Sequence, residues 1–376
     1  MSRTAKLLAE LIALPSVNPA FAAEAGPLTG EQRVAEFLAA TAAKAGLDVG
    51  LRPVTPGRPN LLTVLSPTGK VRQRLLLAPH LDTVSPASGA QLIPARRQGR
   101  LYGRGACDTK GSAAAMFTAL CEVARAKTRP RHTEIVFAGL MDEEHAQTGS
   151  RALAESGFRA NLAIVGEPTR LQVVTAHKGS LWLRVETRGR AAHGATPHLG
   201  RNAVHTMARV VEFLQTAYAA RLRRQLHPLL GHATVSVGRI GGGGQPNIVP
   251  DRCHIEVDRR TLPGETEAGV CCELAALLRA QGLSAKVSSV KGAPCAPLET
   301  DPTLPLVRQF LASIGQRRPV GVHYFCDAAV LAEAGIPSVV FGPGDIAQAH
   351  TADEWISLAQ LERGKEMLVH FLKALP

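Results

Sequence analysis

Apolar positions along the first 170 residues form short runs of strand length, separated by longer stretches with helical spacing. The strand-like runs lie at 61–65, 75–78, 134–141 and 162–165, and the stretch 109–126 is rich in Ala, with apolar residues recurring at helical spacing. Strands that alternate with helices are typical of an α/β sheet covered by helices. The pattern therefore predicts an α/β domain at the start of the chain.

The pattern changes in the middle of the chain, where strand pairs are each followed by a helix. We expect strands at 171–176 and 180–187, as a hairpin around Lys178-Gly179, then at 234–238, 254–258 and 285–290, with helices at 203–218 and 265–281. This predicts a small α+β domain with one exposed sheet face. Beyond it the α/β pattern returns, with helices at 303–314, 328–334 and 358–375 and a strand at 338–341. We therefore expect residues 175–290 to be inserted into a discontinuous domain formed by 1–174 and 291–376.

Histidine and acidic residues stand where several of these predicted strands and turns end. The carboxyl ends of strands in α/β sheets are where such proteins bind ligands. Imidazole and carboxylate donors together suit Zn²⁺, Co²⁺ or Mn²⁺ better than they suit a thiolate site. The residues at these ends are His80, Asp82, Asp108, Glu143, Glu144, Glu167 and His350.

Taken singly, most of these residues also fit a structural role. Asp108 stands in a glycine-rich turn before a predicted helix, where aspartate is a favoured cap, and the acidic run 142–144 also fits a solvated loop. If the run lies at a metal site, one glutamate can bind the metal while its neighbour acts as general base. Asp82, two residues after His80, can orient the imidazole, as carboxylates next to metal-bound histidines commonly do.

Composition narrows the class of protein. The net charge is +12, but the basic residues are scattered and aromatic residues make up only 4% of the 376 residues, so we expect no nucleic-acid partner. No apolar run approaches the roughly 20 residues that cross a bilayer, and no signal-peptide pattern precedes the amphipathic stretch 7–12. The seven cysteines form no regular framework, and we expect a cytoplasmic protein without a membrane partner.

As a set and in this order, the motifs resemble those of the M20 metallopeptidase family, which includes acetylornithine deacetylase, succinyl-diaminopimelate desuccinylase, aminoacylase and glutamate carboxypeptidase. The resemblance covers essentially the whole chain. It implies a zinc-peptidase-like α/β catalytic domain with an inserted, ferredoxin-like α+β lid that serves in dimerisation. It also implies two divalent metal ions, Zn²⁺ first and Co²⁺ or Mn²⁺ as alternatives. The implied roles are a bridging carboxylate for Asp108, ligands of one metal for His80 and Glu167, ligands of the other for Glu144 and His350, a general base for Glu143 and an orienting carboxylate for Asp82.

The middle domain carries further matches to the family. His193, within 192–197, resembles the lid histidine that reaches the partner subunit's active site, and Asn247 follows the glycine run 241–244 as the family's substrate-binding asparagine does. Arg260 resembles the arginine that binds the substrate carboxylate. Arg259 competes for that role, since neighbouring residues on a strand face opposite sides.

The resemblance implies a metal-dependent amidohydrolase that acts as a homodimer on an N-acyl amino acid or a short peptide. The stretch 342–355 is most similar to acetylornithine deacetylases. Succinyl-diaminopimelate desuccinylase and a dipeptidase or carboxypeptidase remain alternatives, as does a catalytically inactive relative that only binds.

Overall fold

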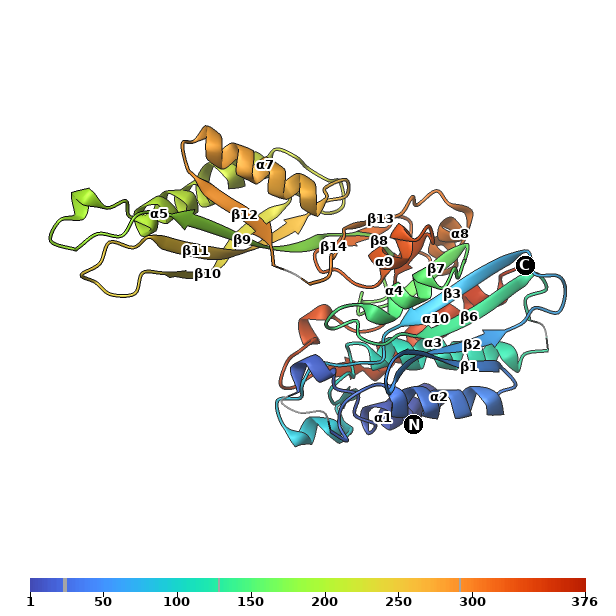
Figure 1. Ribbon diagram of the computed structural model, residues 1–376. Helices are drawn as coiled ribbons and strands as arrows, with labels where there is room; N and C mark the ends of the chain where they lie inside the picture. The colour runs from blue at the N-terminus through green and yellow to red at the C-terminus, as the bar shows by residue number, and fades with distance from the viewer. Residues whose placement is uncertain (23–25, 128, 291) are drawn as a thin grey trace. The chain divides into compact units, whose positions relative to one another are not determined.

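The structure, a computed structural model, describes residues 1–22, 26–127, 129–290 and 292–376. The chain divides into two compact units (Figure 1). The first unit comprises Met1–Thr175, Thr300–Val320 and Cys326–Pro376, and the second comprises Ala176–Glu299 and Gly321–Phe325.

A nine-stranded sheet of order β1-β2-β6-β3-β7-β15-β8-β13, with β14 paired to β8, is the main sheet of the first unit, while β13 and the ends of β8 and β14 are counted in the second unit. Its centre is parallel, because β3 pairs in parallel with β6 and β7, and β15 in parallel with β7. The strands are β1 (Asp48–Thr55), β2 (Arg58–Leu65), β3 (Gln73–Pro79), β6 (Thr133–Gly139), β7 (Leu162–Gly166), β8 (Val174–His177), β13 (Leu298–Glu299), β14 (Val320–Val322) and β15 (Ser338–Val340). The predicted α/β class is confirmed.

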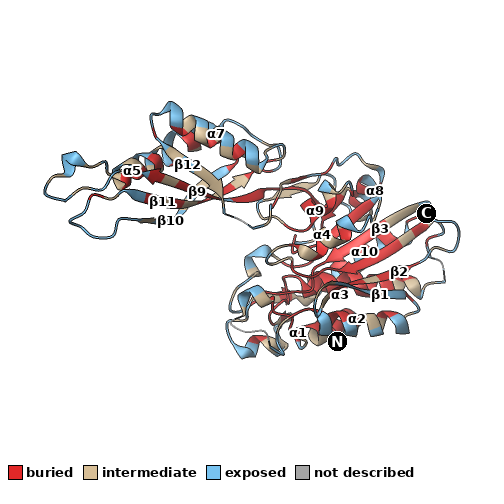
Figure 2. Cartoon of the chain, in the orientation of Figure 1, coloured by how far each residue is buried: buried red, intermediate tan, exposed pale blue. Residues whose placement is uncertain are grey.

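Helices cover both faces of this sheet, and the central strands are consequently buried along nearly their whole length (Figure 2). Strand residues such as Leu75 and Phe137 belong to one large core cluster with α1, α2, α3, α8 and α10. On the other face, α9 packs on β7 and β15, and α4 packs on α9. The helices are α1 (Arg3–Ile12), α2 (Gln32–Lys44), α3 (Lys110–Ala124), α4 (Thr148–Glu155), α8 (Pro305–Ser313), α9 (Ala328–Glu333) and α10 (Leu358–Lys373).

Helix α3 lies at the centre of the first unit. Nearly all of its residues are buried, because it packs against the sheet as well as against α1 and α10. Its many alanines suit this position, since a helix that is apolar all round can be buried on every side. The packing places the N-terminus of α3, next to Asp108, inside the first unit.

A separate three-stranded sheet of order β16-β5-β4 joins two segments of the first unit that are far apart in the sequence. Trp355 pairs with Tyr102, and Ser357 pairs with Arg100. The pairing brings the segment after His350 alongside the segment before Asp108. The strands are β4 (Ala95–Arg97), β5 (Arg100–Tyr102) and β16 (Trp355–Ser357).

The second unit is an antiparallel four-stranded sheet of order β10-β11-β9-β12, with helices packed on its buried face. Along β11, buried residues alternate with partly exposed ones, so the other face of the sheet is open. The predicted small α+β fold is confirmed. Its elements are β9 (Gly179–Arg188), α5 (Ala203–Phe213) with the π-helical Leu214–Tyr218 and α6 (Ala219–Arg223), β10 (Thr234–Gly242), β11 (Arg252–Thr261), α7 (Glu267–Ala280) and β12 (Ala285–Ser289).

The hairpin predicted around Lys178-Gly179 is wrong. Strand β8 pairs antiparallel with β15 and β13, whereas β9 pairs with β11 and β12 in the other sheet. The physical reason is that the two strands suit different surroundings. All four residues of β8 are buried, as in a sheet covered on both faces, whereas buried and more exposed residues alternate along the later part of β9, as in a sheet with one open face. The chain therefore leaves one sheet and enters the other at Lys178.

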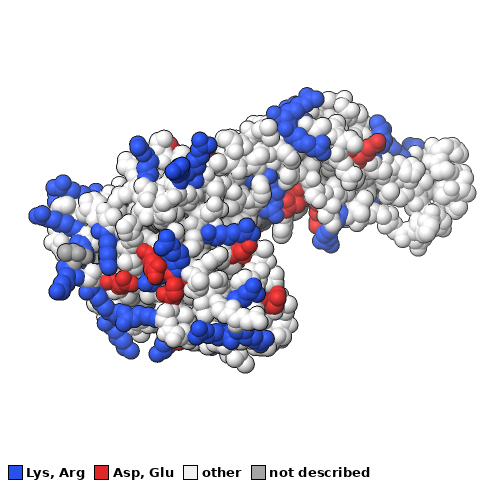
Figure 3. Space-filling view, turned by 180° about the vertical axis from the view of Figure 1, so that it is seen from behind, with Lys and Arg blue, Asp and Glu red and all other residues white. Residues whose placement is uncertain are grey.

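Charged side chains are distributed in separate groups. On the face shown in Figure 3, Lys and Arg side chains lie at many separate places, with Asp and Glu among them. Within the described parts of the chain, no helix is both long and apolar enough to cross a membrane.

Candidate metal centre

The candidate site lies at the carboxyl end of the parallel strands of the first unit. His80 directly follows β3, Glu143 and Glu144 stand in the turn after β6, and Glu167 follows β7. Because these three strands are parallel neighbours, their carboxyl ends meet at one edge of the sheet. Asp108, just before α3, completes the arrangement from beside this edge.

One group of possible metal ligands consists of His80, Asp108 and Glu167, all buried. The His80 Nε2 atom lies 3.1 Å from Asp108 Oδ1 and 3.8 Å from Glu167 Oε1. One ligand atom from each residue lies within 4.8 Å of the others.

A second group consists of Asp108, Glu144 and His350, and its ligand atoms also lie within 4.8 Å of one another. His350 Nε2 lies 3.3 Å from Asp108 Oδ2 and 3.1 Å from Glu144 Oε2. The His350 side chain is 54% exposed, whereas that of Glu144 is 6% exposed. Asp108 thus faces one histidine with each of its carboxylate oxygens, and it is the residue common to both groups.

The electrostatics of the site are those of crowded, buried carboxylates. Burial and neighbouring carboxylates raise the pKa of Glu144 to about 7 and hold the pKa of Glu167 well above its ordinary value. Burial also acts to raise the pKa of Asp108, but hydrogen bonds to His350 and His80 outweigh it and lower that pKa. Glu167 Oε1 has no hydrogen-bond partner among the described residues.

The site fits divalent metal ions on these observations. Buried carboxylates that repel one another, an unpartnered carboxylate oxygen and two imidazoles form an oxygen and nitrogen donor set of the kind that Zn²⁺ and similar ions bind. A bound cation would also offset the repulsion between these carboxylates.

Glu143 lies beside both groups and belongs to neither. Its Oε2 atom is 4.0 Å from His80 Nε2, and its side chain is 11% exposed. Burial, with neighbouring carboxylates, holds its pKa well above the ordinary value although His80 acts to lower it. The interpretation of 142–144 as a solvated loop is wrong, because these carboxylates are largely buried.

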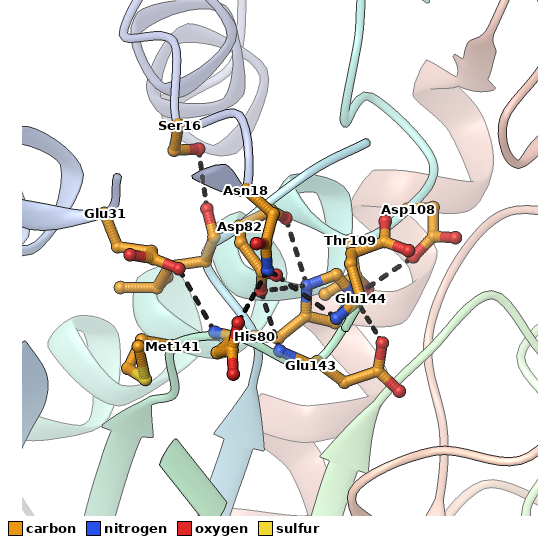
Figure 4. A network of polar contacts seen from close by, with 12 residues as sticks. Ser16, Asn18, Glu31, His80, Asp82, Asp108, Thr109, Met141, Glu143 and Glu144 are labelled. Carbon is orange, nitrogen blue, oxygen red and sulfur yellow. Dashed lines mark hydrogen bonds and ion pairs between the residues drawn. The ribbon is translucent and has the colours of Figure 1, made fainter. Parts of the chain in front are cut away.

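Asp82 makes more contacts than sequence reasoning predicted (Figure 4). Its Oδ1 atom lies 3.2 Å from His80 Nδ1 and accepts a hydrogen bond from the Glu143 backbone N–H at 3.1 Å. Its Oδ2 atom accepts hydrogen bonds from the Glu144 backbone N–H at 3.1 Å and from Asn18 Nδ2 at 2.8 Å. One buried carboxylate therefore positions both the end of β3 and the turn after β6.

The structure tests the interpretation of Asp108 as a helix cap. Helix α3 begins at Lys110 with Thr109 as its N-cap residue, and no side-chain capping hydrogen bond is present there. The Asp108 carboxylate instead contacts His80 and His350. Its interpretation as a helix cap is therefore wrong.

The residues predicted on the lid all lie in the second unit. His193 and Asn247 are on adjacent turns, since His193 forms a β-bridge with Ile248 and the Gly194 N–H donates to the Asn247 carbonyl at 2.7 Å. Both residues are exposed.

The two arginines of β11 differ in their surroundings. Arg259 is fully buried and pairs with Glu265. Arg260 lies on the open face of the sheet with its side chain 32% exposed, and its Nε atom is 2.8 Å from Asp258 Oδ1. Of the two, Arg260 has the guanidinium that solvent reaches.

Two acidic residues near the site were missed by sequence reasoning. Asp327 is buried, accepts a hydrogen bond from the Ser150 hydroxyl at 2.5 Å, and has its pKa raised to about 6 by burial. It directly precedes α9, where an aspartate would be read as a cap, yet it makes no capping hydrogen bond. Glu354 follows His350 by four residues and is 1% exposed. The position of Glu354 four residues after the predicted ligand His350 was the sequence signal that could have identified it.

Comparison with known proteins places the chain among metal-dependent hydrolases. Residues 76–374 match the peptidase family M20/M25/M40. The chain is 34% identical to an acetylornithine deacetylase of Myxococcus xanthus, over 82% of each chain. It is 31% identical to an acetylornithine deacetylase of Proteus mirabilis, over 96% of this chain and 94% of the relative.

Solved structures show the same fold. Aminopeptidase PepT from Bacillus cereus superposes with a TM-score of 0.80 at 24% identity, covering 99% of this chain and 97% of the other. A Bacillus subtilis protein described as a dinuclear metal binding peptidase from the M20 family gives a TM-score of 0.73 at 12% identity, with the same coverage. With the family match over most of the chain and the donor groups of the first unit, these findings identify the chain as a member of peptidase family M20/M25/M40 and a metal-dependent amidohydrolase.

Proposed function

We propose that this enzyme hydrolyses the amide bond of an N-acyl amino acid, with N²-acetylornithine as the first candidate, using two divalent metal ions. The observation that carries the proposal is the position of Asp108, which is shared by two groups of possible ligands beside Glu143, an acid that belongs to neither group. A shared carboxylate of this kind suits a pair of ions acting together.

In this proposal His80 and Glu167 would hold one ion, Glu144 and His350 would hold the other, and Asp108 would contribute to both. Zn²⁺ is the first candidate, since the donors are imidazole nitrogens and carboxylate oxygens, and Co²⁺ or Mn²⁺ suits the same donors. When bound, such ions polarise the substrate carbonyl and make water more acidic. Asp82 holds His80 and the Glu143–Glu144 backbone in place through the hydrogen bonds described above.

Glu143 is the proposed general base. Its carboxylate takes a proton from the attacking water and returns it to the nitrogen of the leaving amine. Its position supports this role, because Oε2 lies within 4.0 Å of His80 Nε2 while the residue belongs to neither donor group. The low exposure of its side chain, 11%, keeps bulk water from competing for the transferred proton.

The second unit supplies the proposed substrate contacts. Asn247 and Arg260 are assigned to the carboxylate end of the substrate, where a guanidinium binds well. His193 is assigned to the substrate carbonyl, reaching it from the partner subunit of a homodimer. Two observations support these assignments: the turns of His193 and Asn247 lie side by side, and Arg260 is the arginine of its pair that solvent reaches.

A kinetic screen tests the proposed reaction. Metal-loaded enzyme is assayed on N-acetylornithine, N-succinyl-diaminopimelate and dipeptides, with Glu143→Ala as the variant that lacks the proposed base. We expect the highest kcat/KM on the N-acetyl substrate and a loss of at least about 10²-fold in kcat for Glu143→Ala, with metal content unchanged.

The other outcomes of the screen are equally informative. Preference for the succinyl substrate or for dipeptides would replace the proposed substrate by one of the alternatives named above. Inactivity of the wild type on every substrate would support an inactive, binding relative. A fully active Glu143→Ala would remove Glu143 from the role of base.

A further inference from the structure

Glu354 is a buried carboxylate that holds the turn carrying Asp108. Its Oε1 atom accepts hydrogen bonds from the backbone N–H groups of Cys107 at 2.8 Å and Asp108 at 3.0 Å. Its Oε2 atom accepts from the Gly105 N–H at 3.0 Å and from Arg104 Nη1 at 2.6 Å. Three backbone N–H groups of the turn thus point at one side chain from a distant part of the sequence.

A second set of hydrogen bonds from the turn holds the segment that carries His350. The Gly103 N–H donates to the Glu354 carbonyl at 3.0 Å, and Arg104 Nη2 donates to the Thr351 carbonyl at 3.2 Å. The Glu354 and Arg104 side chains are 0% and 4% exposed. The turn at 103–108 therefore donates a set of buried and part-buried hydrogen bonds to both the backbone and the side chains of the segment at 350–354.

His350 requires such support. Its backbone has φ of 62°, the left-handed region, which residues other than glycine seldom adopt. Backbone of this kind persists where the surrounding structure determines it. The hydrogen bonds from the 103–104 backbone and side chain to Thr351 and Glu354 supply that constraint just beyond His350.

We propose that Glu354 is the positioning residue that sets Asp108 and His350 at the spacing needed to share a metal ion, an inference that rests on the proposed two-metal function. Glu354 belongs to neither donor group, so it acts through the backbone of the residues that do. His80, Glu144 and Glu167 are held by other elements, with Asp82 binding the first two. Glu354 thus supports two donors of the group Asp108, Glu144 and His350 but only one donor of the group His80, Asp108 and Glu167, so the ion of the first group depends on it more strongly.

The test substitutes Glu354→Gln, which keeps the shape of the side chain. The glutamine N–H₂ cannot accept hydrogen bonds, so it faces backbone N–H groups that need an acceptor. The matched control is Asp353→Asn, the same change of acid to amide at the neighbouring, exposed position. Metal-free wild type and variants are titrated with Co²⁺, and two binding constants are obtained from the visible absorption of the bound ions.

We expect Glu354→Gln to weaken one of the two Co²⁺ affinities by about 10- to 100-fold, the range seen when residues supporting metal ligands are replaced. The other affinity changes far less, and the control binds like the wild type. Thermal unfolding of the metal-free proteins is measured in parallel. Arg104→Lys keeps the charge beside Glu354 but cannot contact Glu354 and Thr351 at once as the guanidinium does, and it is expected to weaken the same ion to a smaller degree.

Unchanged Co²⁺ affinities in Glu354→Gln would overturn the inference. So would an equal weakening of both sites together with a matching loss of stability in the metal-free protein. If Glu354→Gln does not fold, normal Co²⁺ binding by Arg104→Lys would overturn it. These failures are distinct from failure of the proposed function. Wild type that binds two ions but hydrolyses no N-acyl amino acid would refute the proposed substrate and leave the role of Glu354 intact.

Discussion

At the scale of single residues, the site is organised by buried polar groups whose partners are far away in the sequence. Asn18 donates to Asp82 at 2.8 Å (Figure 4). It also donates to Asp142 at 2.9 Å, and so separates two buried carboxylates. Asp142 also contacts Arg58, whose guanidinium pairs with the buried Glu31. An unpaired buried acceptor costs about 1–3 kcal/mol, so this network stabilises the turn that carries Glu143 and Glu144.

One buried histidine outside the metal centre makes stability depend on pH. Burial lowers the pKa of His177 to about 4 from an ordinary 6.5. Its Nδ1 atom lies 3.0 Å from the Lys178 carbonyl, and Nε2 has no hydrogen-bond partner among the residues the structure describes. Between pH 6.5 and about pH 4, His177 is therefore protonated in the unfolded chain but neutral in the folded chain. Stability from this group is complete above pH 6.5 and falls as the pH drops toward 4.

The predicted loss is about 2 kcal/mol between pH 7 and pH 5, at roughly 1.4 kcal/mol per pH unit below the unfolded pKa. Urea unfolding of wild type and His177→Asn at both pH values measures it, and the variant should lose that much less stability on acidification. His205→Asn, at an exposed position on α5, controls for the loss of one histidine. An equal pH dependence in wild type and His177→Asn would show that the imidazole is not kept neutral by burial.

At the scale of elements, apolar periodicity predicted most helices and strands of both units, because long amphipathic stretches and short apolar runs are local signals. The positions of His80, Glu143, Glu144 and Glu167 were also predictable, since parallel strands present their carboxyl ends at one edge. Pairing between β8 and β15, and between β5 and β16, was not. Such pairings depend on residues far apart in the sequence, and so do the hydrogen bonds of Glu354, Asp327 and Asn18.

At the scale of the whole molecule, the ligand residues and Glu143 belong to one unit, and His193, Asn247 and Arg260 belong to the other. A proposal in which His193 acts on the partner's substrate requires a dimer. We expect sedimentation equilibrium of the active enzyme to give twice the chain mass of 39.8 kDa. Mixing an inactive Glu143→Ala chain with an inactive His193→Ala chain should then restore activity. An active monomer, or no recovery on mixing in spite of dimer formation, would contradict action in trans.

The central claim is a pair of metal ions that share Asp108, and the number of ions bound per chain tests it most directly. Metal-free wild type and Asp108→Ala are dialysed against Zn²⁺, and bound metal is counted by elemental analysis. Because Asp108 belongs to both donor groups, the account predicts two ions per wild-type chain and loss of both ions in Asp108→Ala. A single ion in the wild type, or two ions retained by Asp108→Ala, would contradict it.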